Sequence, residues 1–322
     1  MRIPDRLLNC VGFIAHDTPQ ITYGGTAFVV GIKSALKGSY LHLVTARHVA
    51  EAVEHGPFIV GLNLKAGGKV MLRSSEGARW WYHPSDKSTD VAVMPFAPSM
   101  YSDYDIQWIS EAYFATPQRI TKYNIGVGDE LTIIGLFTRF SGSTKHFPIV
   151  RIGSVAMMPT DKIPVKDFGE MEVYLAEGRS IGGLSGSPVF VRNTTSMPPM
   201  KTEDGELRHF SGFGEMHLFG LMHGHWDLPV GFKTYEQQEA VNMGVSIVVP
   251  AKIILETLYH PELVEMRNEY DEQARKKDYP TADSASKNSE RKQPIFTKKD
   301  FEAVLEKAGR KMKPTKIGRA HV

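Results

Sequence analysis

The chain has 322 residues, of which 42% are hydrophobic, enough for about two structural units with cores of their own. Its 38 basic and 36 acidic residues leave a formal net charge of +2, so no basic field over the whole chain points to nucleic acid. The single cysteine, Cys10, excludes an intramolecular disulfide and any structural zinc site made of cysteines.

The start of the chain shows no sign of a cleavable leader. Its apolar segment, residues 10–15, is short, and no small-residue cleavage pattern follows it. No apolar run in the sequence reaches the length that crosses a bilayer. We therefore expect a soluble protein of the reducing cytoplasm that does not associate with membranes.

Short apolar runs broken by turn residues fill the first half of the chain, a pattern typical of all-β sandwiches and barrels. Strands this short need a closed sheet to hide their edges. The predicted strands are 9–16, 25–32, 40–45, 58–64, 69–73, 78–82 and 90–96. Residues 97–125 carry less strand signal and are predicted to cross over to a second β unit.

The second half repeats the pattern of short strands. The predicted strands are 130–137, 150–158, 172–176, 189–192, 217–223 and 243–249. After Pro250 the apolar spacing changes to that of a short helix. Two long stretches, 193–215 and 226–242, are predicted as surface loops, the second with a short helix at 235–241.

Composition changes from Glu262 onward, where 11 acidic and 15 basic residues fall among the last 61. Such charge density with few aliphatic residues predicts a solvated, disordered tail. Within it, 297–309 has the spacing of an amphipathic helix that could dock a protein partner. The basic segment 291–319 raises the alternative of a nucleic-acid or membrane-surface anchor, which we do not favour. We interpret the last residues, 316–322, as translated adapter sequence.

Residues 182–188, Gly-Gly-Leu-Ser-Gly-Ser-Pro, predict a tight turn ahead of an apolar strand. Such a turn can present the hydroxyl of Ser185 and aim backbone N–H groups at one point beside it, which is how an oxyanion is stabilised without a charged side chain. Taken alone, the motif also fits a plain hairpin turn.

Two other stretches supply the partners that a serine nucleophile requires. His48 lies where a strand ends and a helical turn begins, and Asp90 opens an apolar strand. A hydroxyl nucleophile near neutral pH needs an adjacent base, and the base needs a third group to fix its tautomer and stabilise the imidazolium. His48, Asp90 and Ser185 are the residue types for these roles.

Together, the segments 24–30, 45–48, 90–93 and 183–188 resemble the trypsin-like serine peptidases of the chymotrypsin fold, in the same chain order of His, Asp and Ser. The resemblance spans about residues 10–258. The Ser-Gly-Ser-Pro ending looks most like the bacterial glutamyl-endopeptidase branch.

The resemblance implies an all-β fold of two six-stranded antiparallel β-barrels. The first barrel would occupy 1–115 and the second, with its closing C-terminal helix, 116–260. The charged tail would follow at 261–322.

The resemblance also assigns roles in a cleft between the barrels. Ser185 would be the nucleophile, His48 the general base and then acid, and Asp90 the residue that orients the base. The N–H groups of Gly183 and Ser185 would form the oxyanion hole. Leu184 stands where zymogen-activated members have aspartate, so activation by a freed N-terminus is not supported.

Specificity residues follow from the same resemblance. Arg179 and Ser180 would lie at the base of the primary pocket, and His223, Gly224 and His225 on its edge strand. A donor-rich pocket would favour Glu, Asp or Gln on the acyl side of the scissile bond. We expect no cofactor and no metal, although His223 and His225 share a strand face and could be read as a metal pair.

Other residues compete for the catalytic roles. Asp86 could replace Asp90 as the orienting group, but its surroundings are those of a loop. His42 lies in mid-strand, where a packed or surface histidine is expected, and Ser187 follows Ser185 at a spacing that faces elsewhere. An α/β-hydrolase is disfavoured because its Gly-x-Ser-x-Gly elbow is not matched.

The sequence therefore predicts a cofactor-independent serine endopeptidase acting on protein or peptide substrates. The alternative is a gated or inactive module of the same fold that holds a protein partner through the cleft or the tail. A cytoplasmic peptidase needs restraint, and the loops 193–215 and 226–242 could gate the cleft.

Overall fold

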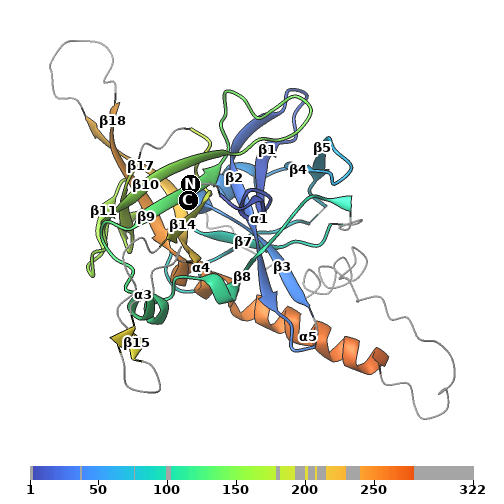
Figure 1. Ribbon diagram of the computed structural model, residues 1–322. Coiled ribbons are helices and arrows are strands. Elements are labelled where there is room, and N and C mark those ends of the chain that lie inside the picture. Colours follow the sequence, from blue (N-terminus) through green and yellow to red (C-terminus); the bar gives the residue numbers. More distant parts are fainter. Residues whose placement is uncertain are drawn as a thin grey trace, which may run out of the picture.

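The computed structural model describes residues 3–278, except for 37, 76, 99–102, 179–181, 193–199, 202–206, 209–214 and 230–239. Two β units lie side by side, and a long helix runs along the outside of the first (Figure 1).

The first unit is an eight-stranded sheet in the order β5-β4-β1-β2-β3-β7-β6, with β8 paired in parallel to β2. Its strands are β1 (Val11–His16), β2 (Thr22–Lys33), β3 (Ser39–Thr45), β4 (Phe58–Asn63), β5 (Lys69–Arg73), β6 (Trp81–Tyr82), β7 (Ala92–Pro95) and β8 (Ile109–Ser110). The predicted strands are confirmed, but the predicted closed six-stranded barrel is not, because among the described residues the two ends of this sheet are not paired with each other.

The second unit is a closed six-stranded barrel in the order β10-β13-β18-β17-β14-β9. Its strands are β9 (Glu130–Gly135), β10 (Ile149–Met157), β13 (Tyr174–Glu177), β14 (Pro188–Arg192), β17 (Met216–Pro229) and β18 (Ala240–Pro250). Side chains that alternate along these strands, among them Leu131, Ile133, Val189 and Val191, fill the barrel interior. The predicted second barrel is thus confirmed.

Two small hairpins lie outside this barrel: β11 (Ile163–Val165) with β12 (Gly169–Met171), and β15 (Met200–Lys201) with β16 (Leu207–Arg208). Strands β17 and β18 also extend into the segment predicted as the loop 226–242. Ala240 and Val241 are paired in β18, which contradicts the predicted helix there; the rest of that helix lies outside the described residues.

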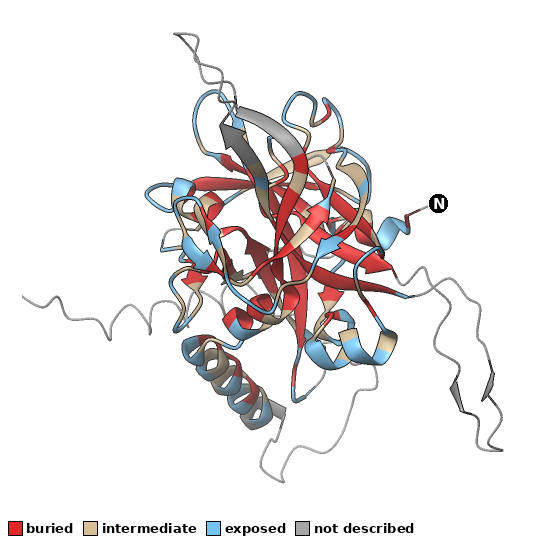
Figure 2. Cartoon of the chain, turned by 90° about the vertical axis from the view of Figure 1, so that its left-hand side faces the viewer, coloured by how far each residue is buried: buried red, intermediate tan, exposed pale blue. Residues whose placement is uncertain are grey.

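One apolar core runs through both units. It joins Phe28 and Val44 of the first sheet to Phe190 and Leu218 of the barrel, and to Ile254 of helix α4 (Ala251–Leu258). Figure 2 shows the buried residues concentrated in the strands of both units. Because this apolar surface is removed from water only when the units are in contact, its burial fixes their relative position.

The crossover predicted at 97–125 contains β8, the short helix η2 (Glu111–Tyr113) and α3 (Pro117–Tyr123). The hydroxyl of Thr116 accepts from the N–H of Arg119 at the start of α3, and Asn124 ends the helix in the left-handed region at φ 51°. The remaining helices are α1 (Asp5–Leu8), α2 (Arg47–Val53) and α5 (Pro261–Asp278). None of the helices in the described ranges is long and apolar enough to span a membrane.

Helix α5 corrects the prediction that the chain becomes a solvated tail at residue 261. Its buried side is a narrow stripe of Leu263, Arg267 and Asp271, spaced four residues apart. Asp271 accepts hydrogen bonds from Ser34 Oγ at 2.8 Å and from Tyr40 Oη at 2.5 Å, so the helix is attached to the first sheet. The helix predicted at 297–309 and the basic segment 291–319 lie outside the described residues.

His42 lies under this helix and gives a test of the packing. Its Nδ1 donates to the carbonyl of Tyr40 at 3.1 Å, and its Nε2 accepts from Arg267 Nη1 at 3.2 Å. Burial, and then the positive charge of Arg267, lower the pKa of His42 from 6.5 to about 3. The unfolded chain therefore takes up a proton near pH 6.5 that the folded chain takes up only near pH 3.

The folded state should lose stability as pH falls from 6.5 towards 3, because the unfolded state binds more protons in that window. We expect His42→Gln to flatten the pH dependence of the unfolding free energy there by up to about 1.4 kcal/mol per pH unit. Urea titrations between pH 4 and 7 measure this slope. The exposed His55→Gln is the control, and equal slopes for the two variants would contradict the assignment.

Candidate active site

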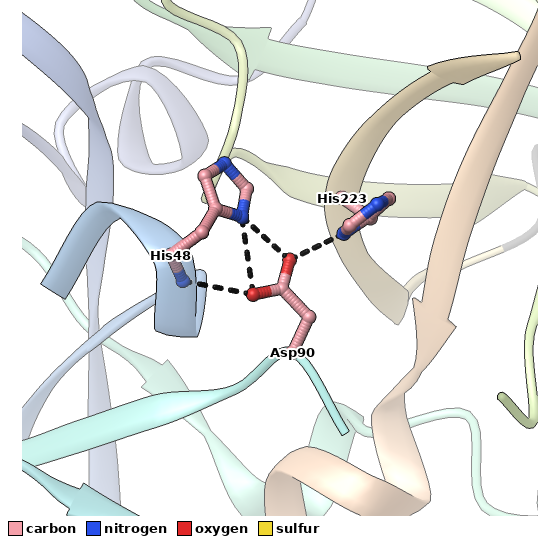
Figure 3. Close-up of side chains that lie close together, drawn as sticks. All are labelled: His48, Asp90 and His223. Atoms are coloured by element: carbon pink, nitrogen blue, oxygen red, sulfur yellow. Dashed lines mark hydrogen bonds and ion pairs between the residues drawn. The ribbon is translucent and has the colours of Figure 1, made fainter. Parts of the chain in front are cut away.

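The candidate site is built around the carboxylate of Asp90, whose side chain has no exposed surface. It lies just before β7, and two imidazoles point at it from opposite sides, His48 from α2 and His223 from β17 (Figure 3). The site thus combines two residues of the first unit, His48 and Asp90, with one residue of the barrel, His223.

His48 holds the carboxylate with both its backbone and its ring. Its main-chain N–H donates to Asp90 Oδ1 at 3.0 Å, and its Nδ1 lies 3.1 Å from Oδ1 and 2.9 Å from Oδ2. Because an ionised carboxylate only accepts, the proton of the neutral ring must be on Nδ1, which leaves the lone pair on Nε2. The His48 side chain is 36% exposed, so a base with a fixed tautomer reaches the surface of the site.

His223 supplies a second imidazole to the same carboxylate. Its Nδ1 lies 2.5 Å from Asp90 Oδ2, and its side chain is only 12% exposed. The sequence predicted His223 as part of a substrate-binding edge strand, with a metal pair with His225 as the alternative. Its ring contact with Asp90 was not foreseen, because nothing local in a strand sequence indicates which distant side chain a histidine will meet.

The environment of Asp90 keeps it ionised. Burial by itself would raise the pKa of Asp90, but the hydrogen bonds and charges of His223 and His48 outweigh burial and hold that pKa well below its usual value. At neutral pH the site therefore contains a permanent negative charge against the Nδ1 face of His48.

The serine turn lies between β13 and β14. Gly183 has φ +97° and Gly186 has φ +83°, backbone conformations that side chains rarely adopt. A Cβ on Gly186 would also lie 2.1 Å from the carbonyl oxygen of Thr26. The turn presents Ser185 half-buried, and its Oγ donates to the carbonyl oxygen of His223 at 3.0 Å. Ser187, the alternative serine, is fully buried.

Thr26 of β2 fastens this turn to the first sheet. Its hydroxyl donates to the carbonyl of Gly183 at 2.7 Å and accepts from the N–H of Leu136 at 2.9 Å. Its main-chain N–H donates to the carbonyl of Ser185 at 2.9 Å. The Gly-Gly-Thr segment that sequence analysis singled out thus holds the serine turn in register with the unit that carries His48 and Asp90.

Phe168, which sequence analysis missed, covers both imidazoles. It lies between β11 and β12, and its ring meets those of His48 and His223 edge-on, with centroids 6.3 and 4.9 Å away. Lys162, beside β11, binds Asp86 at 2.8 Å and ties this hairpin to the loop before Asp90. A lone phenylalanine in a turn carries no sequence signal that would have indicated this position.

The other residues predicted for the site lie at different places around it or outside the described residues. Asp86 accepts from Lys162 and Ser88, which lower its pKa to about 2, and it lies in the loop as expected. Gly224 and the exposed His225 lie on β17 beside His223. The residues predicted at the base of the primary pocket, Arg179 and Ser180, lie outside the described part of the chain.

One potential metal-binding group occurs among the described residues: His48, Asp90 and His223 each offer a ligand atom within 4.8 Å of the other two. Two histidines and a carboxylate are ligand types that Zn²⁺ accepts. However, both Nδ1 atoms already bond to Asp90, so hydrogen bonding alone accounts for the cluster. The sequence suggested His223 with His225 as a metal pair, but His225 is not part of this group.

Comparison with family models finds none that matches the chain. The curated proteins likewise contain no match.

Solved structures do show similarity. The MamO protease domain from Magnetospirillum magneticum is 12% identical with a TM-score of 0.47, covering 78% of this chain and 96% of its own. The HtrA-type protease AlgW, solved with a tripeptide, is 15% identical with a TM-score of 0.44, covering 79% of this chain and 60% of its own. Deg5 is 15% identical with a TM-score of 0.43, covering 78% and 88%. The glutamyl-endopeptidase branch stays a prediction.

The Thr26 hydroxyl provides a test of how the turn is held. Thr26→Val keeps the shape of the side chain but leaves the carbonyl of Gly183 and the N–H of Leu136 without this partner. We expect the free energy of unfolding to fall by about 1–3 kcal/mol, as measured by denaturant titration. Thr22→Val, the same change at an exposed position of the same strand, is the control. Equal stability of the two variants would show that the Thr26 hydroxyl does not hold the turn.

Proposed function

We propose that the chain is a serine endopeptidase that cleaves peptide bonds through an acyl-enzyme. Ser185 is the nucleophile, His48 the general base and then acid, and Asp90 the orienting carboxylate. The observation that carries the proposal is the buried carboxylate of Asp90 on the Nδ1 side of His48, which leaves the opposite ring nitrogen as the base.

In the first half-reaction, Ser185 Oγ attacks the carbonyl carbon of the scissile bond while His48 Nε2 takes the hydroxyl proton. The resulting imidazolium is stabilised by Asp90 and then gives its proton to the departing amine. In the second half, a water gives its proton to Nε2 and attacks the acyl carbon, and the proton returns to Ser185 as the acid leaves. No cofactor is needed for either half.

The step requires the Ser185 hydroxyl to leave the carbonyl of His223 and turn towards His48. A rotation about one side-chain bond changes its direction, and such rotations are fast in partly exposed residues. The bond to His223 is then the resting position of the nucleophile. Substrate entering the site would replace it.

The oxyanion hole is proposed at the N–H groups of Gly183 and Ser185. Among the backbone bonds of the described residues outside strands and helices, neither group donates to a carbonyl. The positive φ of Gly183 supports this use, because it turns the local peptide groups away from a regular strand direction. Two donors aimed at one point suit the negative oxygen of a tetrahedral intermediate.

For substrates we propose proteins or peptides that extend along β17 at Gly224 and His225. Preference for Glu, Asp or Gln on the acyl side follows from the predicted pocket residues Arg179 and Ser180. A peptide-library profile that favours basic or bulky apolar residues would overturn the specificity while leaving the reaction class intact.

We also propose that the enzyme acts in the cytoplasm.

The test compares cleavage profiles of a denatured proteome by the wild type, Ser185→Ala and Ser187→Ala. We expect Ser185→Ala to lose about four orders of magnitude or more in turnover, because the nucleophile is removed. Ser187→Ala removes a hydroxyl from the same turn and should keep most of the activity.

Two results would count against the proposal. Cleavage by Ser185→Ala at the wild-type rate would mean that another residue or another protein performs the reaction. No cleavage by the wild type under any condition would favour the gated or inactive binding module instead.

A further inference from the structure

We propose that His223 is a positioning residue for the catalytic apparatus, a role that rests on the peptidase function proposed above. Its ring holds Asp90 in place, and its main chain holds Ser185. His223 thereby connects the orienting carboxylate to the nucleophile through a single residue of the barrel.

Among the described residues, the ring of His223 makes the shortest contact with Asp90. Nδ1 of His223 lies 2.5 Å from Oδ2, against 2.9 Å for Nδ1 of His48. The His223 ring is also more enclosed, with its side chain 12% exposed against 36% for His48. A hydrogen bond to an ionised group strengthens when water is excluded, so the His223 bond is the better placed to fix the carboxylate.

The main chain of β17 is held against the serine turn at His223 and at the residue before it. The carbonyl of His223 accepts from Ser185 Oγ at 3.0 Å. One residue earlier, Met222 exchanges two backbone bonds with the turn: its carbonyl accepts from Gly186 N at 2.8 Å, and its N–H donates to Ser187 O at 2.9 Å. The position of His223 relative to Ser185 is therefore set by the backbone and does not depend on the ring.

The chemical consequence concerns the proton that His48 takes from Ser185. While His48 carries that proton on Nε2, the carboxylate must stay ionised, because the ion pair is what stabilises the imidazolium. The N–H of His223 lowers the basicity of Asp90 by donating to Oδ2. It also prevents the carboxylate from rotating. Such a rotation would break the bond to Nδ1 of His48, and the tautomer of His48 would no longer be fixed.

Two substitutions separate this role from packing. His223→Leu replaces the ring with an apolar side chain of similar size that has no donor. His223→Asn has a side-chain N–H at about the reach of Nδ1. Both keep the main-chain carbonyl that receives Ser185 Oγ, so only the ring contact changes.

For His223→Leu we expect kcat to fall about 10- to 100-fold, while KM for a peptide substrate changes less than about twofold. His223→Asn should recover most of kcat. A rise in KM with kcat preserved would show that His223 serves only as a substrate-binding residue and would overturn the inference. Equal kcat in His223→Leu and the wild type would also overturn it.

A second measurement does not depend on activity. In a protein labelled with ¹⁵N-histidine, we expect two downfield imidazole N–H protons, from His48 and His223, both bonded to Asp90. His223→Leu should remove one of them and shift the other. If the wild type shows only one such proton, the inference is wrong whether or not peptides are cleaved. If both are present but the wild type never cleaves peptides, the proposed function fails while the contact of His223 with Asp90 stands.

Discussion

The burial of one carboxylate constrains the whole site. Asp90 has no exposed surface, and an unpaired charge in such a place costs several kcal/mol in folding free energy, so its partners must be built into the fold. Those partners come from both units, the backbone and ring of His48 from the first and the ring of His223 from the second. The two units must therefore close on each other before the charge is compensated, and the same bonds fix the tautomer of His48.

A separate set of bonds holds the serine turn. Thr26 connects β2 of the first sheet to the backbone of Gly183 and Ser185, and a Cβ at Gly186 would collide with the carbonyl oxygen of Thr26. The apolar core that runs from Phe28 to Phe190 presses the same surfaces together. The orienting carboxylate and the serine turn are thus positioned by different contacts across one interface, and His223 contacts both.

The sequence predicted those elements whose residue pattern can be recognised within a short stretch of the chain. Most strands were predicted because apolar runs end at Gly, Pro and Ser. The three residues proposed as catalytic were chosen because they have the required residue types and stand in short local motifs. Helix α5 was missed because two residues of its buried stripe, Arg267 and Asp271, are charged, and the contacts that compensate them lie far away in the chain. The same holds for the His223 ring and for the two-residue strand β8, whose partners are set by tertiary structure alone.

The central claim is that Ser185 is a nucleophile activated by His48. It is tested most directly by reacting the folded protein with a fluorophosphonate and locating the adduct by peptide mass mapping. The account predicts a single adduct on Ser185 that forms in the wild type and is lost or strongly slowed in His48→Ala. An adduct on another residue, or one on Ser185 that forms equally fast without the imidazole of His48, would contradict it.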